Sequence, residues 1–288
     1  LKKYKMFING DWVESESNLT KEEWETHRDW VLSFCGDVVN PGESLEGGKY
    51  FRENFWNKHP DLKKLINNKE MILHVYEQAL SSKVGNVLVV TPDNEINKLV
   101  KNNGGNCFLS VGDHETGTDR VYEAFENFFS SKPRIIINLQ GDMPNLNPDA
   151  IVKLNDYLKK GVCDIGTLGS LITNRNEIKN KNIVKVITKN NLEKFSVSEA
   201  LDFKRENIND DEKFVFHHIG IYGFTNNSLT KFINFKRSPL EKDRKLEQMR
   251  ALENKMKIHV VYTKSNPLGV DTEADLEEIR KIMEKNNV

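Results

Sequence analysis

Short apolar runs alternate with amphipathic segments along most of the chain, beginning near residue 66. The runs are rich in aliphatic residues and are bounded by polar turns, which is typical of buried strands. They predict strands over 86–90, 107–111 and 134–142. Apolar positions at helical spacing predict helices over 71–81, 95–103, 118–130 and 148–159. Because strands and helices alternate, we expect an α/β fold with a mostly parallel central sheet flanked by helices.

The second half of the chain carries more strand patterns than the first. They predict strands over 164–172, 183–188, 216–224 and 257–263. Residues 240–254 favour a single helix with i,i+4 charge pairs, such as Glu241 with Lys245. A last helix is expected over 272–285, capped by Thr272.

Residues 1–65 differ in composition from the rest of the chain. They contain all four tryptophans and a glycine-rich stretch at 40–48. Thr20 suits a helix cap, and residues 31–35 favour a short strand. The pattern divides the chain into an atypical N-terminal segment, 1–65, and a main domain, 66–288.

Composition narrows the function classes. The 288 residues include 42 lysines and arginines against 43 aspartates and glutamates, for a net charge of −1. This balance argues against a surface that binds nucleic acid as a whole. The three cysteines are far apart, which favours a reducing compartment over a disulfide scaffold. No apolar run approaches the ~18 residues of a membrane span, so a cytoplasmic protein without a membrane partner is expected.

Two aspartates end strand-like runs and are the sharpest candidates for a functional site. Asp142 follows Gln140 and Gly141, and Asp271 comes two positions after Gly269. Ligands of α/β sheets bind at the carboxyl ends of strands, and glycine lets the backbone approach a ligand closely. Two converging carboxylates could hold Mg²⁺ against the phosphates of a nucleotide. The alternative is that each aspartate is only a turn residue or a helix cap.

The loop at 112–120 joins an expected strand to an expected helix. Thr118 and Asp119 suit the helix start, and Arg120 could reach a carboxylate or a phosphate. The alternative is a polar loop with a good helix cap.

The strand expected at 216–224 places His218, Gly220 and Tyr222 on one face. This face could bind a sugar, or it could be a core histidine beside a buried tyrosine. A metal site is not expected there, because no third ligand has suitable spacing.

Glu247, Gln248 and Arg250 fall in the helix expected over 240–254. Most charges of that helix are expected to form a solvated face. One polar pair could instead turn toward a pocket.

Several motifs follow one another in order along the chain. In the first half they are NNK at 67–69, MILHV at 71–75, TGTDR at 116–120 and NLQGD at 138–142. In the second half they are VKV at 184–186, HHIGIYG at 217–223, SPLE at 238–241, LEQMR at 246–250 and GVDT at 269–272. With these motifs the chain resembles the 3-deoxy-manno-octulosonate (Kdo) cytidylyltransferases from about residue 66 to residue 282. The resemblance implies a nucleotide-diphospho-sugar transferase-like, Rossmann-like fold with a small β-rich dimerisation subregion.

The same resemblance implies an activity and a set of residues. It implies a cytoplasmic, Mg²⁺-dependent homodimer that transfers CMP from CTP to Kdo, releases pyrophosphate and supplies lipopolysaccharide synthesis. Asp142 and Asp271 are the implied catalytic and metal-holding acids. The implied nucleotide-binding residues are Gln140, Gly141 and Lys185. The implied sugar-side residues are Arg120, His218, Tyr222, Glu247 and Gln248.

The front of the chain departs from this family. The family's opening strand and its basic CTP-binding loop have no counterpart before Asn67. Residues 31–35 could supply the missing strand, and 42–49 with Arg52 could form a substitute loop. Two hypotheses follow: an active cytidylyltransferase, or an inactive relative that acts as a sugar-binding or regulatory subunit.

Overall fold

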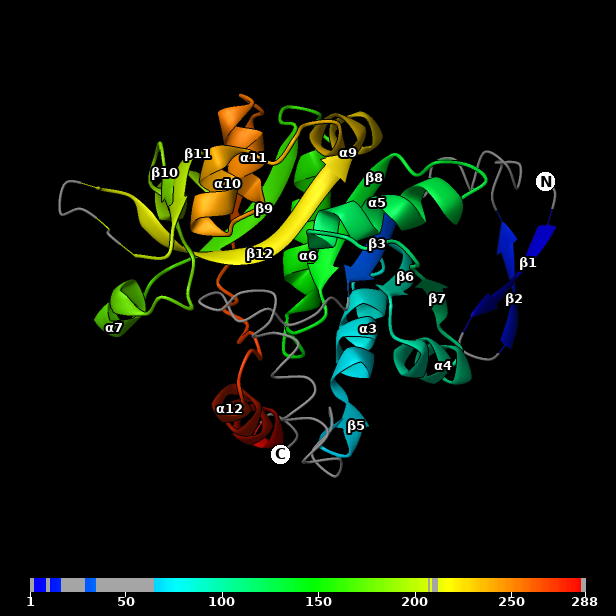
Figure 1. Ribbon diagram of the computed structural model, residues 1–288. Coiled ribbons are helices and arrows are strands. Elements are labelled where there is room, and N and C mark those ends of the chain that lie inside the picture. The colour runs from blue at the N-terminus through cyan, green and yellow to red at the C-terminus, as the bar shows by residue number, and fades with distance from the viewer. Residues whose placement is uncertain are drawn as a thin grey trace.

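A nine-stranded sheet forms the centre of the part of the chain that the structure describes (Figure 1). This computed structural model describes residues 3–8, 11–16, 29–34, 65–206, 208 and 212–285. The strand order is β10-β11-β13-β9-β12-β8-β3-β6-β7. The strands span β3 Asp29–Phe34, β6 Gly85–Thr91, β7 Asn106–Leu109, β8 Ile135–Gln140, β9 Ile165–Ser170, β10 Lys185–Thr188, β11 Val197–Lys204, β12 Val215–Thr225 and β13 Ile258–Tyr262.

The sheet is mixed rather than mostly parallel as expected, because β11 and β12 pair antiparallel with all their neighbours. Parallel pairs join β3 to β6 and β8, β6 to β7, and β13 to β9. The long strand β12 lies antiparallel between β8 and β9, and it also pairs with β10. The α/β class is confirmed, but β12 interrupts the parallel order that the alternating pattern predicts. Periodicity identifies a strand but not its direction, so the sequence pattern did not show that β12 runs antiparallel to its neighbours.

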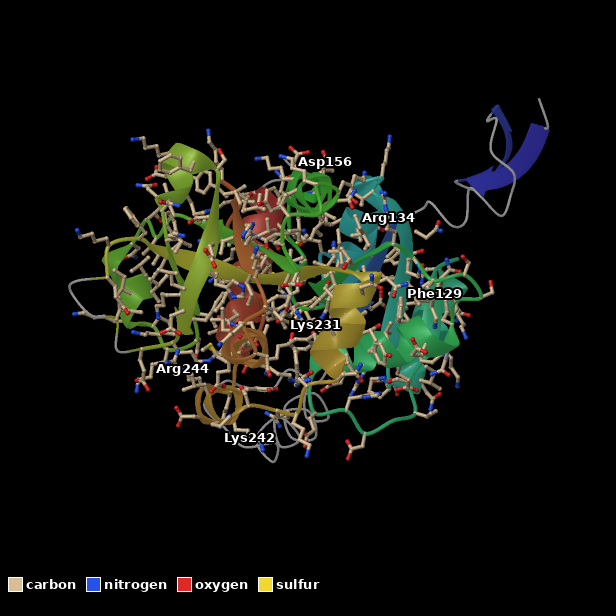
Figure 2. All side chains as sticks on the ribbon, turned by 90° about the horizontal axis from the view of Figure 1, so that it is seen from above. Phe129, Arg134, Asp156, Lys231, Lys242 and Arg244 are labelled. Atoms are coloured by element: carbon tan, nitrogen blue, oxygen red, sulfur yellow. The ribbon has the colours of Figure 1, made fainter. Side chains whose placement is uncertain are left out.

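Helices cover both faces of the sheet and separate two apolar cores. Helices α5 (Gly117–Asn127) and α9 (Asn226–Ile233) pack on one face, and α3 (Met71–Ser81) and α6 (Pro148–Leu158) pack on the other. Strand β8 contributes side chains to both cores, because Ile136 faces the first and Ile137 faces the second. Charged side chains such as Asp156 and Lys242 lie on the outside (Figure 2).

The remaining elements are short or peripheral. They are the hairpin strands β4 Leu65–Ile66 and β5 Lys69–Glu70, and the helices α4 Asn94–Asn102, α7 Arg175–Lys179, α8 Leu192–Phe195 and α12 Glu273–Lys285. The sequence patterns did not predict α7, α8, α9 or β11. Helices α7 and α8 have 5 and 4 residues, too short for a periodic pattern to develop.

Strand β3 comes from the segment that the sequence set apart from the main domain. It lies between β6 and β8 and runs parallel to both. The expected short strand at 31–35 is therefore confirmed, and it occupies a central position. The boundary predicted at residue 65 does not separate β3 from the sheet. Strands β1 (Lys3–Ile8) and β2 (Asp11–Glu16) pair with each other, while the expected Thr20 cap and the loop at 42–49 lie outside the described residues.

The single helix expected over 240–254 is wrong. The structure divides it into α10 (Pro239–Arg244) and α11 (Gln248–Glu253). Lys245 takes a left-handed conformation with φ of 53°, and the next amide, of Leu246, donates to the Glu241 carbonyl. This turn ends α10 at Arg244, with Lys245 as its C-cap.

Helix α6 packs against a glycine of β12, which gives a test of this packing. A Cβ on Gly223 would lie 2.1 Å from Leu158 Cδ1, and Leu158 is only 3% exposed. Gly223→Ala is therefore expected to lower the free energy of unfolding by about 2 kcal/mol, measured by urea denaturation. Gly220→Ala on the same strand is the control, because its nearest atom would be 4.0 Å away. An equal loss in both variants would contradict this account.

Candidate functional site

The structure brings the two predicted aspartates together. Asp142 follows the carboxyl end of β8, and the Val270 amide donates to the Asp142 carbonyl at 3.0 Å, next to Asp271. Burial and the charge of Asp271 raise the pKa of Asp142 to about 7. Burial and the charge of Asp275 raise the pKa of Asp271 to about 6, although Arg205 lowers it. The two carboxylates therefore share one electrostatic environment.

A small third core holds Asp271 in place. Val270, beside it, packs with Ile66 of β4 and with Leu276 and Ile279 of α12. Asp275 Oδ2 accepts hydrogen bonds from the Asp271 and Thr272 amides. Thr272 Oγ1 in turn accepts from the Asp275 amide, so the expected Thr272 cap is confirmed. Thr272 and Asp275 thus cap the start of α12. The Asp271 carboxylate is not used as a helix cap and can take another role.

The donor set of this site fits Mg²⁺. Asp142 Oδ1 is buried and has no hydrogen-bond partner in the described part of the chain. A buried carboxylate oxygen without a donor is costly, and a cation would offset that cost. No group of three or more histidine, cysteine or acidic side chains suited to a metal exists among the described residues. Two carboxylates are nevertheless enough for Mg²⁺, which usually keeps water and substrate phosphates as its other ligands.

Gln140 and Gly141 lead directly into Asp142. Gln140 ends β8 and is half-buried, and Gly141 is buried. Gln140 Cγ lies 4.0 Å from the position that a Cβ on Gly220 would take. The side chain of Gln140 therefore lies beside the β12 glycine, on the same strand as His218 and Tyr222.

His218 and Tyr222 lie side by side and are buried, with ring centroids 5.5 Å apart. Ile219 pairs with Leu168 whereas Tyr222 pairs with Thr167, so β12 has a bulge between them. Thr167 Oγ1 lies 2.7 Å from the Ile221 carbonyl, to which it donates, and 2.9 Å from His218 Nε2. This pattern assigns the ring proton to Nε2, which donates to Thr167.

Electrostatics keep both rings of this pair neutral. Burial, His217 and Arg205 lower the pKa of His218 to about 3. Burial and Glu247 raise the pKa of Tyr222 well above its usual value. His218 therefore fits the description of a hydrogen-bonded core histidine, and its role toward a sugar stays a prediction.

Arg205 is a member of this site that the sequence patterns did not indicate. Its charge acts on Asp271, Tyr222 and His218, and its Nε is buried without a hydrogen-bond partner in the described part of the chain. Burial lowers its pKa, while Asp271 and Tyr222 raise it. Arg205 follows β11, a strand that the sequence pattern did not predict. Recognising that strand in the sequence would have drawn attention to Arg205.

Lys185 is fully buried at the start of β10 and does not join the two aspartates. Its Nζ donates to the carbonyls of Asn180 and Arg205, each at 2.6 Å. Burial and the charge of Arg205 lower the pKa of Lys185 to about 8. The ammonium is therefore committed to backbone carbonyls, and its role at the nucleotide stays a prediction.

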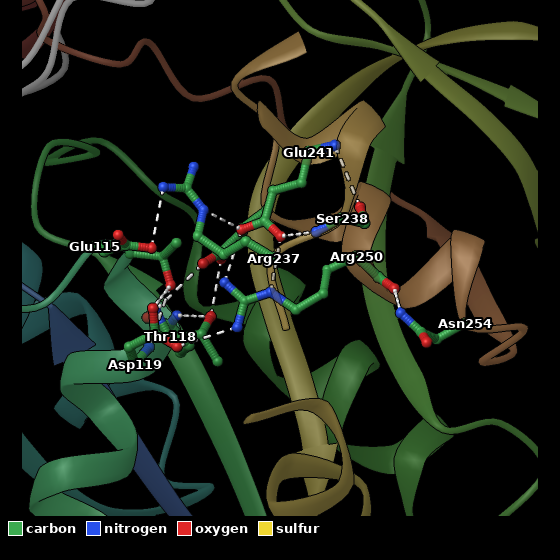
Figure 3. Close-up of polar contacts among 11 residues, drawn as sticks. Glu115, Thr118, Asp119, Arg237, Ser238, Glu241, Arg250 and Asn254 are labelled. Carbon is green, nitrogen blue, oxygen red and sulfur yellow. Dashed lines mark hydrogen bonds and ion pairs between the residues drawn. The ribbon is translucent and has the colours of Figure 1, made fainter. Parts of the chain in front are cut away.

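A buried ionic network joins three of the motifs (Figure 3). Arg250 is 2% exposed, and its Nε and Nη2 donate to both carboxylate oxygens of Glu241 at 2.9 and 2.7 Å. Its Nη1 donates to Asp119 at 3.1 Å, and its guanidinium stacks 4.6 Å from the Phe232 ring centre. Arg237 adds a contact to Glu241 and one to Glu115. The solvated face expected for most charges of 240–254 includes Lys242, Asp243, Lys245 and Glu253, which are exposed. The expectation is wrong for Glu241 and Arg250, because the turn at Lys245 points them at each other.

Glu247 and Gln248 lie next to this network, and Glu247 contacts the first turn of α5. Glu247 accepts from the Thr118 hydroxyl at 2.8 Å and from the Thr118 amide at 3.3 Å. Burial raises the pKa of Glu247 in spite of these bonds. Gln248 is 3% exposed, and its Nε2 has no hydrogen-bond partner in the described residues. Arg120 is buried in the first turn of α5, on the same helix as Thr118.

The chain is similar in sequence to known cytidylyltransferases. The sequence profile of the family "Cytidylyltransferase" matches residues 62–258. The 3-deoxy-manno-octulosonate cytidylyltransferase of Bartonella henselae is 41% identical over 220 residues, covering 76% of this chain and 89% of the relative. The enzyme of the same name from Brucella ovis is 41% identical over 216 residues, covering 75% and 86%.

Solved structures show the same likeness in the fold. A CMP:2-keto-3-deoxy-manno-octonic acid synthetase in complex with CTP superposes with a TM-score of 0.71 and 28% identity, covering 90% of this chain and 99% of that one. A 4-diphosphocytidyl-2C-methyl-D-erythritol synthase from Anaerococcus prevotii gives a TM-score of 0.55 at 10% identity, a likeness of fold alone. Among the described residues, no helix is both long and apolar enough to cross a bilayer. From the profile match and the 41% identity of its relatives, the chain belongs to the cytidylyltransferase family and is a nucleotidyltransferase.

Proposed function

We propose that this protein transfers CMP from CTP to the acidic sugar Kdo, with Mg²⁺, and releases pyrophosphate. The observation that carries the proposal is the pairing of Asp142 and Asp271 in a chain 41% identical to Kdo cytidylyltransferases. The product, CMP-Kdo, would supply lipopolysaccharide synthesis. By family likeness, we also propose a cytoplasmic homodimer.

The reaction joins a sugar oxygen to the α-phosphorus of CTP. The oxygen of the anomeric hydroxyl of Kdo bonds to the α-phosphorus, and its proton passes to solvent. The bond from the α-phosphorus to the oxygen that bridges to the β-phosphorus breaks, and pyrophosphate leaves. Mg²⁺ held by Asp142 and Asp271 would neutralise phosphate charge during this exchange. The protein's own contribution is alignment of the two substrates in a site that partly excludes water. Gln140 and Gly141 would line the nucleotide side of that site.

The sugar side needs a cation for the Kdo carboxylate and neutral donors for its hydroxyls. Arg205 offers a guanidinium whose Nε has no partner among the described residues, near Tyr222 and His218. Both rings stay neutral at physiological pH, so they can exchange hydrogen bonds with hydroxyls without adding charge. Glu247, Gln248 and Arg120 would complete this side, as the family likeness implies.

The proposal predicts pyrophosphate release when the purified protein receives CTP, Mg²⁺ and Kdo. A coupled phosphate assay is the measurement, with ATP in place of CTP as the nucleotide control. Release should require all three components and should vanish in Asp142→Ala. Light scattering of the same sample should give twice the chain mass of 33.3 kDa.

Two outcomes would count against the proposal. Kdo binding without any release would favour the alternative of a sugar-binding subunit. Release that persists in Asp142→Ala would exclude the paired aspartates as the metal site.

A further inference from the structure

Lys185 and Arg205 hold the same short loop from two sides. The loop at 180–182 precedes β10 and offers three successive carbonyls. Lys185 Nζ donates to the Asn180 carbonyl, while Arg205 Nη1 donates to those of Lys181 and Asn182 at 3.3 and 3.1 Å. Lys185 Nζ also donates to the carbonyl of Arg205 itself, at 2.6 Å. The ammonium thus fixes both the main chain of Arg205 and the loop that receives its guanidinium.

These contacts hold the guanidinium of Arg205 in one orientation. Nη1 is occupied by carbonyls, and Nε is buried without a partner in the described part of the chain. Asp271 and Tyr222 are close enough to change the pKa of this guanidinium. An arginine fixed at its main chain and at one nitrogen can present its remaining donors as a preorganised pair to a planar anion.

We infer that Lys185 is a positioning residue for Arg205, and that it sets the affinity for the acidic sugar rather than for the nucleotide. The inference rests on the proposed function for the identity of that sugar. A lysine at the nucleotide would need a free ammonium, and the two backbone bonds of Lys185 leave it little reach. Burying a lysine is costly unless it is hydrogen-bonded, and these carbonyls meet that need.

The test separates sugar affinity from nucleotide affinity. Lys185→Met should raise the KM for Kdo about tenfold, since a displaced arginine loses part of a charge-assisted bond. The KM for CTP should stay within about twofold. Lys185→Arg, which keeps a cation near both carbonyls, should recover most of the loss. Lys189→Met is the matched control, because Lys189 follows the same strand and its side chain is 63% exposed.

A double-mutant cycle tests whether Lys185 acts through Arg205. Arg205→Ala alone should raise the KM for Kdo more than Lys185→Met does, and adding Lys185→Met to it should change little further. Additive losses, or a rise in the KM for CTP alone, would overturn the inference.

An NMR measurement keeps the inference testable without turnover. The ¹⁵N–¹H NOE of Arg205 Nε should fall in Lys185→Met, which would show a more mobile guanidinium, and stay unchanged in Lys189→Met. An unchanged NOE in Lys185→Met would overturn the inference. If Lys185→Met does not fold, Lys185→Gln gives the same readouts with a smaller change. Absence of turnover in the wild-type protein would count against the proposed function, whereas the NOE would still decide the positioning role.

Discussion

Asp142→Asn is expected to reduce CMP transfer by at least about 10³-fold, because one of two metal-holding carboxylates loses its charge. The substitution keeps the shape of the side chain, so the fold should remain intact. Asp271→Asn should act in the same way, and the double variant should be little worse than either single one. Initial rates of pyrophosphate release at saturating CTP and Kdo are the measurement. Asp156→Asn, an exposed aspartate on α6, is the control and should leave the rate unchanged.

The same substitution should also change how stability depends on pH. The pKa of Asp142 is raised to about 7 and that of Asp271 to about 6, both above the ordinary value of 3.8. The folded protein therefore holds protons that the unfolded chain has released. Its stability should fall as pH rises from about 4 to about 7. Asp142→Asn should flatten this fall, and Mg²⁺ should reverse it in the wild-type protein by favouring the ionised pair.

Urea denaturation near pH 5 and near pH 8, with and without Mg²⁺, is the measurement of this linkage. A wild-type stability that rises over that interval without Mg²⁺ would contradict the closeness of the two carboxylates. Equal effects of Mg²⁺ on the wild type and on Asp142→Asn would contradict a shared metal site.

Arg250→Met is expected to lower stability more than any other variant named above. It would leave the carboxylate of Glu241, which is 1% exposed, without its bidentate partner. Breaking a buried pair by removing one partner costs about 3–5 kcal/mol. Burial lowers the pKa of Arg250, but Glu241 and Asp119 raise it above its usual value, which indicates the strength of this pairing. For a chain of this size the unfolding midpoint should fall by about 10 °C, measured by calorimetry.

The matched control is Lys242→Met, an exposed lysine on α10 beside Glu241. It should change the midpoint by at most about 1 °C. The double variant Arg250→Met with Glu241→Met should recover part of the loss, because it leaves no buried charge of this pair uncompensated. A double variant less stable than Arg250→Met would contradict this account, and would show that the remaining bonds of Glu241 to Arg237 and to the Ser238 amide outweigh the cost of its unpaired charge.

Arg250→Met is expected to reduce activity as well as stability, because the network positions residues of the proposed sugar side. The network joins the first turn of α5 to α10 and α11, and next to it Glu247 accepts hydrogen bonds from Thr118. Loss of Arg250 would therefore displace Glu247 and Gln248 on the proposed sugar side.

Local signals in the sequence were sufficient for most of the secondary structure. Helix α3 spans the predicted residues, and α6 ends one residue early, because helical spacing of apolar side chains is a short-range pattern. The cap at Thr272 followed from neighbouring residues in the same way. The order of the motifs likewise indicated the family and singled out the pair Asp142 and Asp271.

Contacts between distant segments needed the tertiary structure. Direction is not encoded in a strand's periodicity, so β12 proved antiparallel and β3 proved central. The sequence pattern did not show that Arg250 is buried, because its partner Asp119 lies 131 residues away along the chain. Arg205 looked unremarkable because its role depends on Asp271 and Tyr222, which other elements bring to it. Neighbouring residues are thus enough to define the elements and the candidate acids. Which charges are buried, and what each one faces, is set by the fold, because burial and charge pairing depend on distances in space.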